Sequence, residues 1–309
     1  MGGLTKNVET NIHSDRNLLG ISLMLGFCFI APILDVFAKL AAQQIPIAQI
    51  TMVRFSGQTF FMLIIILVLR NSITIPFFLF LPLVSRAAYL IIATFCFFSA
   101  IKTMPIADAV AIVFIEPFIL LLIGKFIFKE TVGIRRTTAC IVGFIGVILV
   151  IKPSFANFGI IALYPLGTAF CFAFYMISTR RISQYLDPIR MQFYTAFLGT
   201  IVCVPIFIFG EFADISTLKT VIPPNMTWLW LFGVALFGTI SHLFISYALK
   251  FASSTVLAPL HYLEIISAVF FGFLVFGDVP DLTALYGMLI IISSGIYIFF
   301  REKSLQKNV

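Results

Sequence analysis

Five ionisable side chains stand inside long apolar stretches of the sequence, where a charge is costly to bury: Asp35, Lys39, Arg54, Glu116 and Glu264. Even on the most lenient insertion scale, an ionisable residue at the centre of a bilayer costs roughly 2.5–3.5 kcal/mol. Such a residue is therefore expected to face a polar cavity or a charged partner. These five are the first candidates for a site that holds a small molecule or an ion.

Glu116 lies in the apolar run AIVFIEPFILLLIGKFIF (111–128), and Pro117 follows it directly. A proline inside a helix removes one backbone N–H and leaves the carbonyl four residues earlier, that of Val113, without its partner. A kinked helix with a free carbonyl beside a carboxyl group suits a polar cavity. The alternative is that Glu116 makes a structural hydrogen bond between two helices.

Glu264 belongs to a second apolar run, PLHYLEIISAVFFGFLVF (259–276), which also contains His261 and Tyr262. Residues three apart share a helix face, so His261 and Glu264 are expected to contact each other. A buried carboxyl group beside an imidazole can exchange a proton near neutral pH, which would couple the site to protons. Substrate contact without coupling and a static pair are the alternatives. The Tyr262 phenol would seek a polar partner beside this face.

The first apolar segments carry the remaining candidates. Asp35 and Lys39 are four residues apart and can pair with each other on one helix face. Lys39 could instead anchor a substrate or serve as the counter-charge of Glu116. Arg54 can either extend toward the membrane surface or bind an anionic group in the site. His242 is interpreted as a hydrogen-bonded packing residue.

The composition excludes a water-soluble globule. Of the 309 residues 61% are hydrophobic and 11% are charged, and the mean hydropathy is +1.11. A soluble domain is about one-quarter charged. The apolar runs are continuous and show no period of two, so they predict helices and not barrel strands. We therefore expect an all-α, multi-pass protein of the cytoplasmic membrane that contacts the lipid bilayer and binds no nucleic acid.

The sequence predicts ten membrane-spanning helices at about 20 residues per crossing. Their ranges are 18–40, 48–69, 84–101, 107–128, 137–152, 159–179, 190–210, 227–250, 255–276 and 282–300. The stretch 71–86 is apolar but contains Pro76 and Pro82, and it is interpreted as an interfacial linker. Gly143 and Gly146 are expected to let two helices approach closely.

The basic residues favour an orientation with both ends in the cytoplasm. Fifteen of the 20 Lys and Arg residues, Arg86 among them, then lie on the inner side, three lie outside and two lie within spans. This distribution follows the positive-inside rule. The predicted organisation is a cytoplasmic N-terminal tail over 1–17, a first five-helix repeat over 18–152, a second over 159–300, and a cytoplasmic C-terminal tail over 301–309.

The two halves of the chain repeat each other. Glu116 coincides with Glu264 at an offset of 148, and nearer the start Lys39 coincides with Arg180 at an offset of 141. Because each unit has five helices, two units in tandem must lie upside down relative to each other. Many secondary transporters have this inverted arrangement, with substrate and ion sites between the repeats near the midplane.

These features resemble the drug/metabolite transporter superfamily of the EamA type. The stretch FIEPFILLLIGKFIFKETVGIRRTTACIVGFIGVILVIKP (114–153) carries the likeness most clearly, with DVFAKL (35–40) in support. It is similar to the branch that includes riboflavin and S-adenosylmethionine uptake carriers. One departure is that Glu264 is followed by Ile265, where Glu116 is followed by Pro117, so the two positions are not equivalent chemically.

The resemblance implies a secondary active transporter of a small organic metabolite, similar to riboflavin, S-adenosylmethionine or an amino acid. It would work by alternating access, with or without proton coupling, as a monomer or weak homodimer. An exporter of the same fold and a channel-like pore are the alternatives. The sequence has no ATP-binding P-loop and no motif of a membrane enzyme, and its five cysteines are scattered in apolar runs. We therefore expect no enzymatic activity, no cofactor and no metal.

Overall fold

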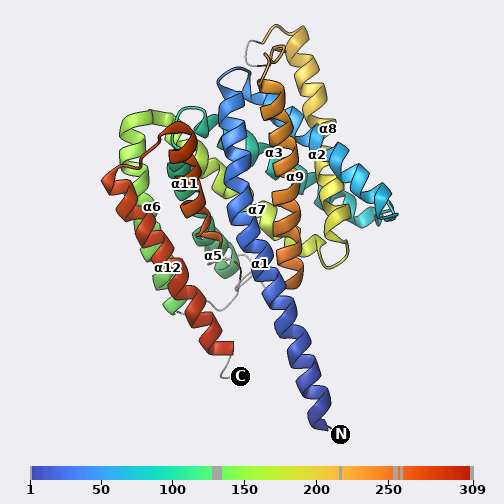
Figure 1. Ribbon diagram of the computed structural model, residues 1–309, viewed down its shortest axis with the longest axis vertical. Coiled ribbons are helices and arrows are strands. Elements are labelled where there is room, and N and C mark those ends of the chain that lie inside the picture. The colour runs from blue at the N-terminus through green and yellow to red at the C-terminus, as the bar shows by residue number, and fades with distance from the viewer. Residues whose placement is uncertain (1, 127–133, 216–217, 253–256, 258–259, 307–309) are drawn as a thin grey trace.

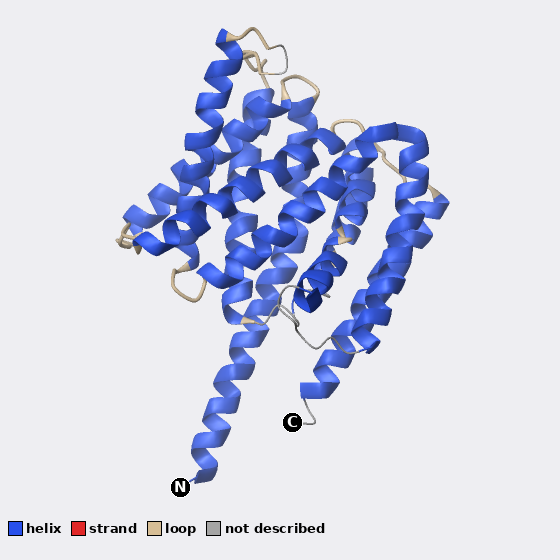
Figure 2. Ribbon diagram, turned by 180° about the vertical axis from the view of Figure 1, so that it is seen from behind, coloured by secondary structure: helices blue, strands red, loops and turns tan. Residues whose placement is uncertain are grey.

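The computed structural model shows a bundle of helices, and in the part of the chain that it describes there are no strands (Figures 1 and 2). The described residues are 2–126, 134–215, 218–252, 257 and 260–306. The α-helices are α1 (Gly2–Ala42), α2 (Ile47–Val68), α3 (Phe80–Ile101), α4 (Ile106–Val113), α5 (Glu116–Phe126), α6 (Ile134–Phe158), α7 (Tyr164–Ile182), α8 (Pro188–Phe212), α9 (Thr227–Phe251), α11 (Glu264–Phe276) and α12 (Leu282–Gln306), with 3-10 turns at Phe77–Leu79 and Gly159–Leu163.

Six helical stretches are long and apolar enough to cross a membrane: Leu18–Ala42, Ile47–Val68, Phe77–Ile101, Thr137–Ile182, Pro188–Phe212 and Thr227–Phe251. The stretch Thr137–Ile182 spans 46 residues and contains two of the predicted crossings. Glu264–Phe276 and Leu282–Tyr297 are apolar but shorter. Both chain ends lie at the same end of the bundle (Figure 1), as an even number of crossings requires. The count of ten itself stays a prediction.

The helices pair in the pattern that a two-fold relation between the halves produces. Helix α1 packs along α9, and α3 packs along α7. Exchanging the two halves places α1 on α7 and α9 on α3, so the α1–α9 pair becomes the α3–α7 pair. The pairs α2–α8 and α6–α12 are also in contact, and each of them maps onto itself under the same exchange. Helix α4 packs against α11, which is the counterpart of α5 in the second half. The internal repeat seen in the sequence is thus matched by the packing.

The span predicted over 107–128 is not one continuous helix. Helix α4 ends at Val113, a turn follows at Phe114 and Ile115, and α5 begins at Glu116. The backbone N–H groups of Phe118 and Ile119 both donate to the carbonyl of Ile115, at 3.0 and 3.1 Å, which closes the first turn of α5. A proline at the second position of this helix loses no hydrogen bond, because that N–H has no partner within the helix in any case.

The second glutamate stands at the same kind of break without a proline. Tyr262 and Leu263 form a turn, and α11 begins at Glu264. The N–H groups of Ile265 and Ile266 donate three residues back, to Tyr262 and Leu263 at 3.3 and 3.0 Å. Part of the predicted span 255–276 lies outside the described residues, namely 255–256 and 258–259. Both glutamates are therefore the first residue of a half-helix.

The prediction of an interfacial linker over 71–86 is wrong for residues 77–86. The chain is helical from Phe77 onward, first as a 3-10 turn and then as α3 from Phe80. Pro82 lies in the first turn of α3, where a backbone N–H has no partner within the helix, so the proline does not interrupt it. The first of these prolines, Pro76, caps the 3-10 turn with an extended backbone.

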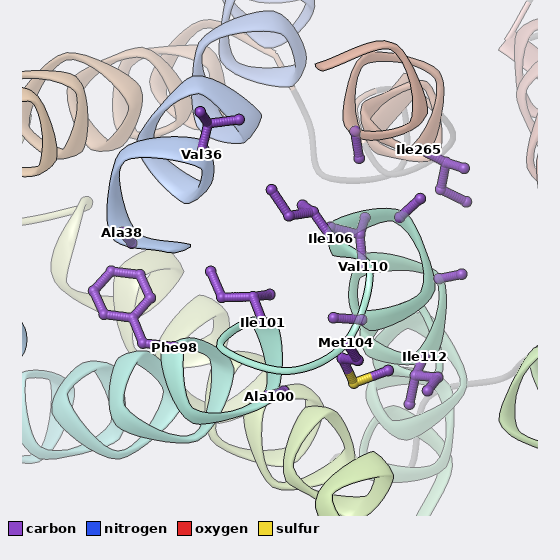
Figure 3. Close-up of a cluster of buried hydrophobic side chains, with 14 of the residues drawn as sticks. Val36, Ala38, Phe98, Ala100, Ile101, Met104, Ile106, Val110, Ile112 and Ile265 are labelled. Carbon is purple, nitrogen blue, oxygen red and sulfur yellow. The ribbon is translucent and has the colours of Figure 1, made fainter. Parts of the chain in front are cut away.

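The largest apolar core joins both halves. Buried side chains of α1, of α3 and α4 and of α11 meet there, including Val36, Phe98, Met104, Val110 and Ile265 (Figure 3). Such side chains pack at the density of organic crystals, so the core holds the helix breaks in fixed positions. The polar site lies beside this core.

Helices α6 and α12 approach closely at two glycines. A Cβ on Gly146 would lie 2.7 Å from the carbonyl oxygen of Gly287, and one on Gly143 would lie 2.9 Å from the Ser294 hydroxyl. The predicted role of Gly143 and Gly146 is therefore confirmed. The crossing thus joins the last helix of the first half to the last helix of the second half.

We expect Gly146→Leu to lower the thermal stability of the detergent-purified protein. The added side chain would push the α6 and α12 backbones apart, and such overpacking typically costs about 1–3 kcal/mol. Ile145→Leu, at a neighbouring exposed position of the same helix, is the control and should leave the unfolding temperature unchanged. An equal unfolding temperature for both variants would show that the close crossing does not hold the two helices together.

Candidate functional site

His261 lies between the two glutamates of the repeats. Its Nε2 is 2.9 Å from Oε2 of Glu264, and its Nδ1 is 4.0 Å from Oε2 of Glu116. That oxygen of Glu116, a side chain only 3% exposed, has no hydrogen-bond partner among the described residues. The predicted contact between His261 and Glu264 is confirmed. The structure adds the third member, Glu116, which begins α5 and lies beside His261 at the break before α11.

Aromatic rings surround the imidazole. The ring of Phe114 is 5.1 Å from His261, that of Phe27 is 5.4 Å away, and that of Phe172 is 6.2 Å away. Tyr262 does not share this face. Its ring packs 5.0 Å from Phe114 and lies against Gly295 of α12, within the apolar core. The group formed by Glu116, His261 and Glu264 is called the carboxyl–imidazole triad below.

A cavity of about 110 Å³ opens beside the triad. Four of the seven candidate residues line it, namely Asp35, Arg54, His261 and Glu264. Lys39 and Tyr262 lie elsewhere, and Glu116 reaches the cavity only through His261. Most of the remaining wall is apolar or aromatic, with a few hydroxyl groups: Phe27, Ala31, Leu34, Leu90, Ala93, Thr94, Phe97, Phe98, Val110, Val113, Phe114, Thr168, Phe172, Ser241 and His242.

Arg54 is buried in the cavity wall and does not extend to the membrane surface. Its side chain is 3% exposed; Nη1 donates to the Thr94 hydroxyl, and Nη2 lies 2.6 Å from Nε2 of His242. Since a guanidinium group only donates, Nε2 of His242 must accept, and the imidazole proton is on Nδ1. Arg54 Nε has no partner among the described residues. The first reading of Arg54, extension outward, is therefore wrong.

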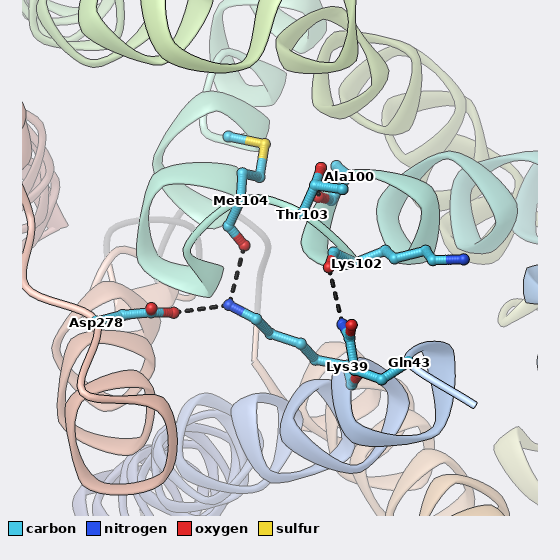
Figure 4. Close-up of polar contacts among 7 residues, drawn as sticks. All are labelled: Lys39, Gln43, Ala100, Lys102, Thr103, Met104 and Asp278. Carbon is cyan, nitrogen blue, oxygen red and sulfur yellow. Dashed lines mark hydrogen bonds and ion pairs between the residues drawn. The ribbon is translucent and has the colours of Figure 1, made fainter. Parts of the chain in front are cut away.

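Asp35 and Lys39 do not pair with each other, contrary to the first alternative. Asp35 lines the cavity and is 5% exposed, and among the described residues it makes no hydrogen bond or ion pair within 4.0 Å. Lys39 points away and binds Asp278 at 2.7 Å and the Met104 carbonyl at 3.2 Å (Figure 4). Its ammonium also lies 4.5 Å from the Phe276 ring. Lys39 is thus not the counter-charge of Glu116.

A second polar cluster, not anticipated from the sequence, is centred on Arg86. Its guanidinium is completely buried and donates to the hydroxyls of Thr179 and Thr195, to Gln192 Oε1, and at 2.7 Å to the Tyr175 hydroxyl. Our assignment of Arg86 to the inner surface is therefore wrong. The sequence did contain one indication of burial, since Arg86 is the third residue of the predicted span 84–101.

This cluster is continuous with the cavity. The Tyr175 hydroxyl lies 3.1 Å from Nδ1 of His242, and Gln192 Nε2 donates to the His242 carbonyl at 2.7 Å. The prediction of His242 as a hydrogen-bonded packing residue is confirmed, and its two ring nitrogens also link the two guanidinium groups. The links Arg86–Tyr175–His242–Arg54 position the last of these side chains at the cavity wall.

The chain matches the EamA-like transporter family over residues 18–152 and 157–300. It belongs to that family. The two matched segments coincide with the two predicted five-helix repeats, apart from small differences at the boundary. The chain is accordingly a multi-pass member of a family of membrane transporters.

Several characterised proteins are similar to this EamA-like transporter. The S-adenosylmethionine uptake transporter of Rickettsia conorii is 27% identical over 199 residues, which cover 64% of this chain and 65% of the relative. The pseudopaline exporter CntI of Pseudomonas aeruginosa is 25% identical over 89% of this chain and 94% of its own. The riboflavin transporter of Vibrio cholerae is 27% identical over 63% of each chain. The match thus spans slightly less than two thirds of the length of the S-adenosylmethionine transporters.

A solved crystal structure has the same fold as this transporter. It superposes with a TM-score of 0.67, covers 94% of this chain and 99% of its own, and is 16% identical in sequence. Identity this low supports the fold alone.

In this transporter the Lys39–Asp278 ion pair joins α1 of the first half to the end of α11 in the second half. We expect Lys39→Gln to slow transport by about tenfold, because truncating one partner of a part-buried ion pair leaves the other charge unpaired. Exchanging the charges, Lys39→Asp with Asp278→Lys, should restore part of the rate. Uptake into proteoliposomes measures both effects.

Lys219→Gln is the matched control for this ion pair. Lys219 pairs with Asp214 at 2.6 Å in the exposed loop after α8, far from the cavity wall. Exposed pairs contribute little, so transport by this variant should equal that of the unmodified protein. If the exchanged pair is no faster than Lys39→Gln alone, the ion pair has no role in the transport cycle.

Proposed function

We propose that the protein is a secondary carrier that moves a small organic metabolite across the cytoplasmic membrane by alternating access, coupled to protons through the carboxyl–imidazole triad. The observation that carries the proposal is the position of His261 between Glu116 of the first half and Glu264 of the second. Each glutamate begins a half-helix at a break. Broken helices that meet between repeats are the usual site of substrate and coupling ions in inverted-repeat carriers.

The packing of the helices supports alternating access. The α1–α9 pair and the α3–α7 pair are counterparts in the relation between the two halves. Each half can therefore adopt the conformation of the other, which would open the cavity first to one side of the membrane and then to the other. We propose ten crossings with both ends in the cytoplasm, following the basic residues. The carrier works as a monomer, since both repeats that form the cavity are in one chain.

Named relatives support a small organic substrate. Their names describe an S-adenosylmethionine uptake transporter, a riboflavin transporter and a pseudopaline exporter. Because relatives of one fold include both uptake and export, we propose that the gradients of substrate and protons decide the direction. Five phenylalanine rings in the cavity wall suit a substrate with a ring system or another apolar portion.

Protons are proposed to bind within the triad. The titratable and charged groups that face Glu264 and His261 come from the other elements packed around them: Glu116 of α5, Cys28 and Asp35 of α1, Arg54 of α2 and His242 of α9. Among the described residues of this set, Glu116 approaches the imidazole of His261 to 4.0 Å, whereas Cys28 Sγ donates to the His261 backbone carbonyl at 3.9 Å. A proton on the triad can therefore be shared between the first and second halves, which makes its occupancy sensitive to their relative position.

Counterflow in proteoliposomes tests the carrier function. Vesicles loaded with an unlabelled compound are diluted into the same labelled compound, with riboflavin, S-adenosylmethionine, amino acids and aromatic cations tested in turn. A carrier is expected to accumulate label transiently and to saturate, whereas a channel-like pore gives neither effect. Absence of counterflow for every compound would contradict the proposal. Saturable counterflow that is identical at pH 6 and pH 8 would contradict only the coupling.

A further inference from the structure

Opposite charges line the same cavity without forming an ion pair in the described part of the chain. Asp35 and Glu264 contribute carboxylates and Arg54 contributes a guanidinium, and these side chains are 5%, 8% and 3% exposed. No ion pair within 4.0 Å joins Arg54 to either carboxylate among the described residues. Buried opposite charges attract strongly and normally pair unless something separates them. A cavity that keeps them apart is arranged for a ligand that meets both.

The Arg54 guanidinium is incompletely satisfied. Of its five N–H groups, only those to Thr94 and to His242 have partners, both of them uncharged acceptors, and Nε has none among the described residues. The link through His242 to Tyr175 and Arg86 holds the group in place. A fixed, buried cation with spare donors is the form in which proteins bind a carboxylate, because a planar guanidinium fits two carboxylate oxygens.

The two carboxylates of the cavity, Glu264 and Asp35, differ in their partners. Glu264 accepts from His261 at 2.9 Å, whereas Asp35 has no hydrogen-bond or ion-pair partner in the described chain. Asp35 is therefore the carboxylate left to meet a cationic group. The rings of Phe97, Phe98 and Phe114 also line the cavity, and aromatic faces add to the attraction for a cation.

We infer that the carried molecule is a zwitterion, with its carboxylate at Arg54, its ammonium or other cationic group at Asp35, and its apolar part against the phenylalanines. An α-amino acid head group is the smallest ligand of this kind. The inference rests on the proposed carrier function and specifies its substrate class. A purely cationic ligand would leave Arg54 uncompensated, a purely anionic one would be repelled by Asp35 and Glu264, and a neutral one would leave both charges unpaired.

Matched ligands test the inference on the purified protein by thermal stabilisation. One series keeps the indole ring: L-tryptophan, tryptamine without the carboxylate, and indole-3-propionate without the ammonium. A second series compares S-adenosylmethionine with its decarboxylated form, and the common amino acids and riboflavin complete the panel. We expect stabilisation by zwitterions, and binding at least about 30-fold weaker for each analogue that lacks one charge. Equal binding of a singly charged analogue, or no binding of any zwitterion, overturns the inference.

Variants assign each charge to its residue. Arg54→Gln is expected to lose the preference for the zwitterion over the analogue without a carboxylate, and Asp35→Asn to lose the preference over the analogue without an ammonium. Arg54→Lys keeps the positive charge and should retain part of the preference if Arg54→Gln fails to fold. Arg190→Gln, which removes an arginine that binds the Thr74 carbonyl outside the cavity, should change neither preference. Unchanged preferences in the folded Arg54 and Asp35 variants overturn the assignment.

The outcomes separate this inference from the carrier function. Counterflow of riboflavin or of an aromatic cation, without binding of zwitterions, would leave the carrier standing and overturn the zwitterion. Binding of a zwitterion without counterflow would support the zwitterion site and contradict the carrier function.

Discussion

Replacing Glu264 with glutamine is expected to abolish the pH dependence of transport while leaving a folded protein in the membrane. Glutamine has the same shape, and its amide can still form a hydrogen bond with Nε2 of His261 in place of the present 2.9 Å contact. It cannot bind or release a proton. The hydrogen bond to His261 also changes from a charge-assisted one to a weaker neutral one, which should slow transport by about tenfold or more.

Transport in proteoliposomes from pH 5.5 to 8.5 measures this effect. Glu211→Gln is the control for the same chemical change, because Glu211 is exposed and, among the described residues, hydrogen-bonds the backbone and hydroxyl of Thr220 in a loop. That variant should transport like the unmodified protein at every pH. If Glu264→Gln keeps the normal pH profile, the glutamate is a substrate contact or a static partner of His261, and coupling lies elsewhere.

Glu116→Gln distinguishes the roles of the two glutamates. Glu116 is 4.0 Å from His261 and its Oε2 has no hydrogen-bond partner in the described chain, so the two positions are not equivalent. We expect this variant to keep ligand binding, because Glu116 does not line the cavity. Its transport should be slow but still dependent on pH. Binding can be measured by thermal stabilisation, independently of transport.

Hydropathy predicted the long apolar helices where the determining interactions are local. A run of about 20 apolar residues can satisfy its backbone in lipid only as a helix. The matched glutamates marked the site for a similar reason, since a carboxyl group in such a run needs a polar surrounding. The contact of His261 with Glu264 follows from helix geometry, and it is confirmed at 2.9 Å.

Contacts between distant segments could not be predicted in this way. Lys39 prefers Asp278, 239 residues away, to the Asp35 one turn earlier on its own helix. Local spacing shows which pairs are possible, but the three-dimensional path of the loop after α11 decides which one forms. The break before Glu264 was missed because no proline marks it. Its mirror at Glu116 has Pro117, and only the repeat relates the two.

Arg86 was misplaced for a related reason. Near the predicted start of a span, an arginine normally reaches the membrane surface. Here hydroxyl and amide groups of α7 and α8 surround the guanidinium, and neither helix can be recognised as its partner from spacing. A buried cation without a carboxylate partner among its hydrogen bonds is costly to a fold, which indicates a role in transport.

Arg86→Met is therefore expected to leave the protein about as stable as before, and yet to slow transport by about tenfold or more. Two opposing effects decide the stability. Taking a guanidinium out of water costs several kcal/mol, and methionine removes that penalty. Of the groups that Arg86 binds, only Gln192 Oε1 loses its sole partner, because Tyr175, Thr179 and Thr195 keep other hydrogen bonds. An unsatisfied acceptor costs about 1–3 kcal/mol, so the two effects nearly cancel.

The loss of transport has a separate cause. Arg86 donates to the Tyr175 hydroxyl, which holds His242, and His242 Nε2 accepts from Arg54. Without Arg86 the Arg54 guanidinium loses its fixed orientation at the cavity wall, and a tenfold loss corresponds to about 1.4 kcal/mol. Arg86→Lys keeps the positive charge but not the planar guanidinium, so its transport rate should lie between those of the unmodified protein and Arg86→Met. Unfolding in detergent and counterflow in vesicles measure the two effects separately. A loss of more than about 3 kcal/mol in unfolding free energy would mean that Arg86 stabilises the fold. The free energy gained by removing the buried charge would then be too small to offset the broken hydrogen bonds.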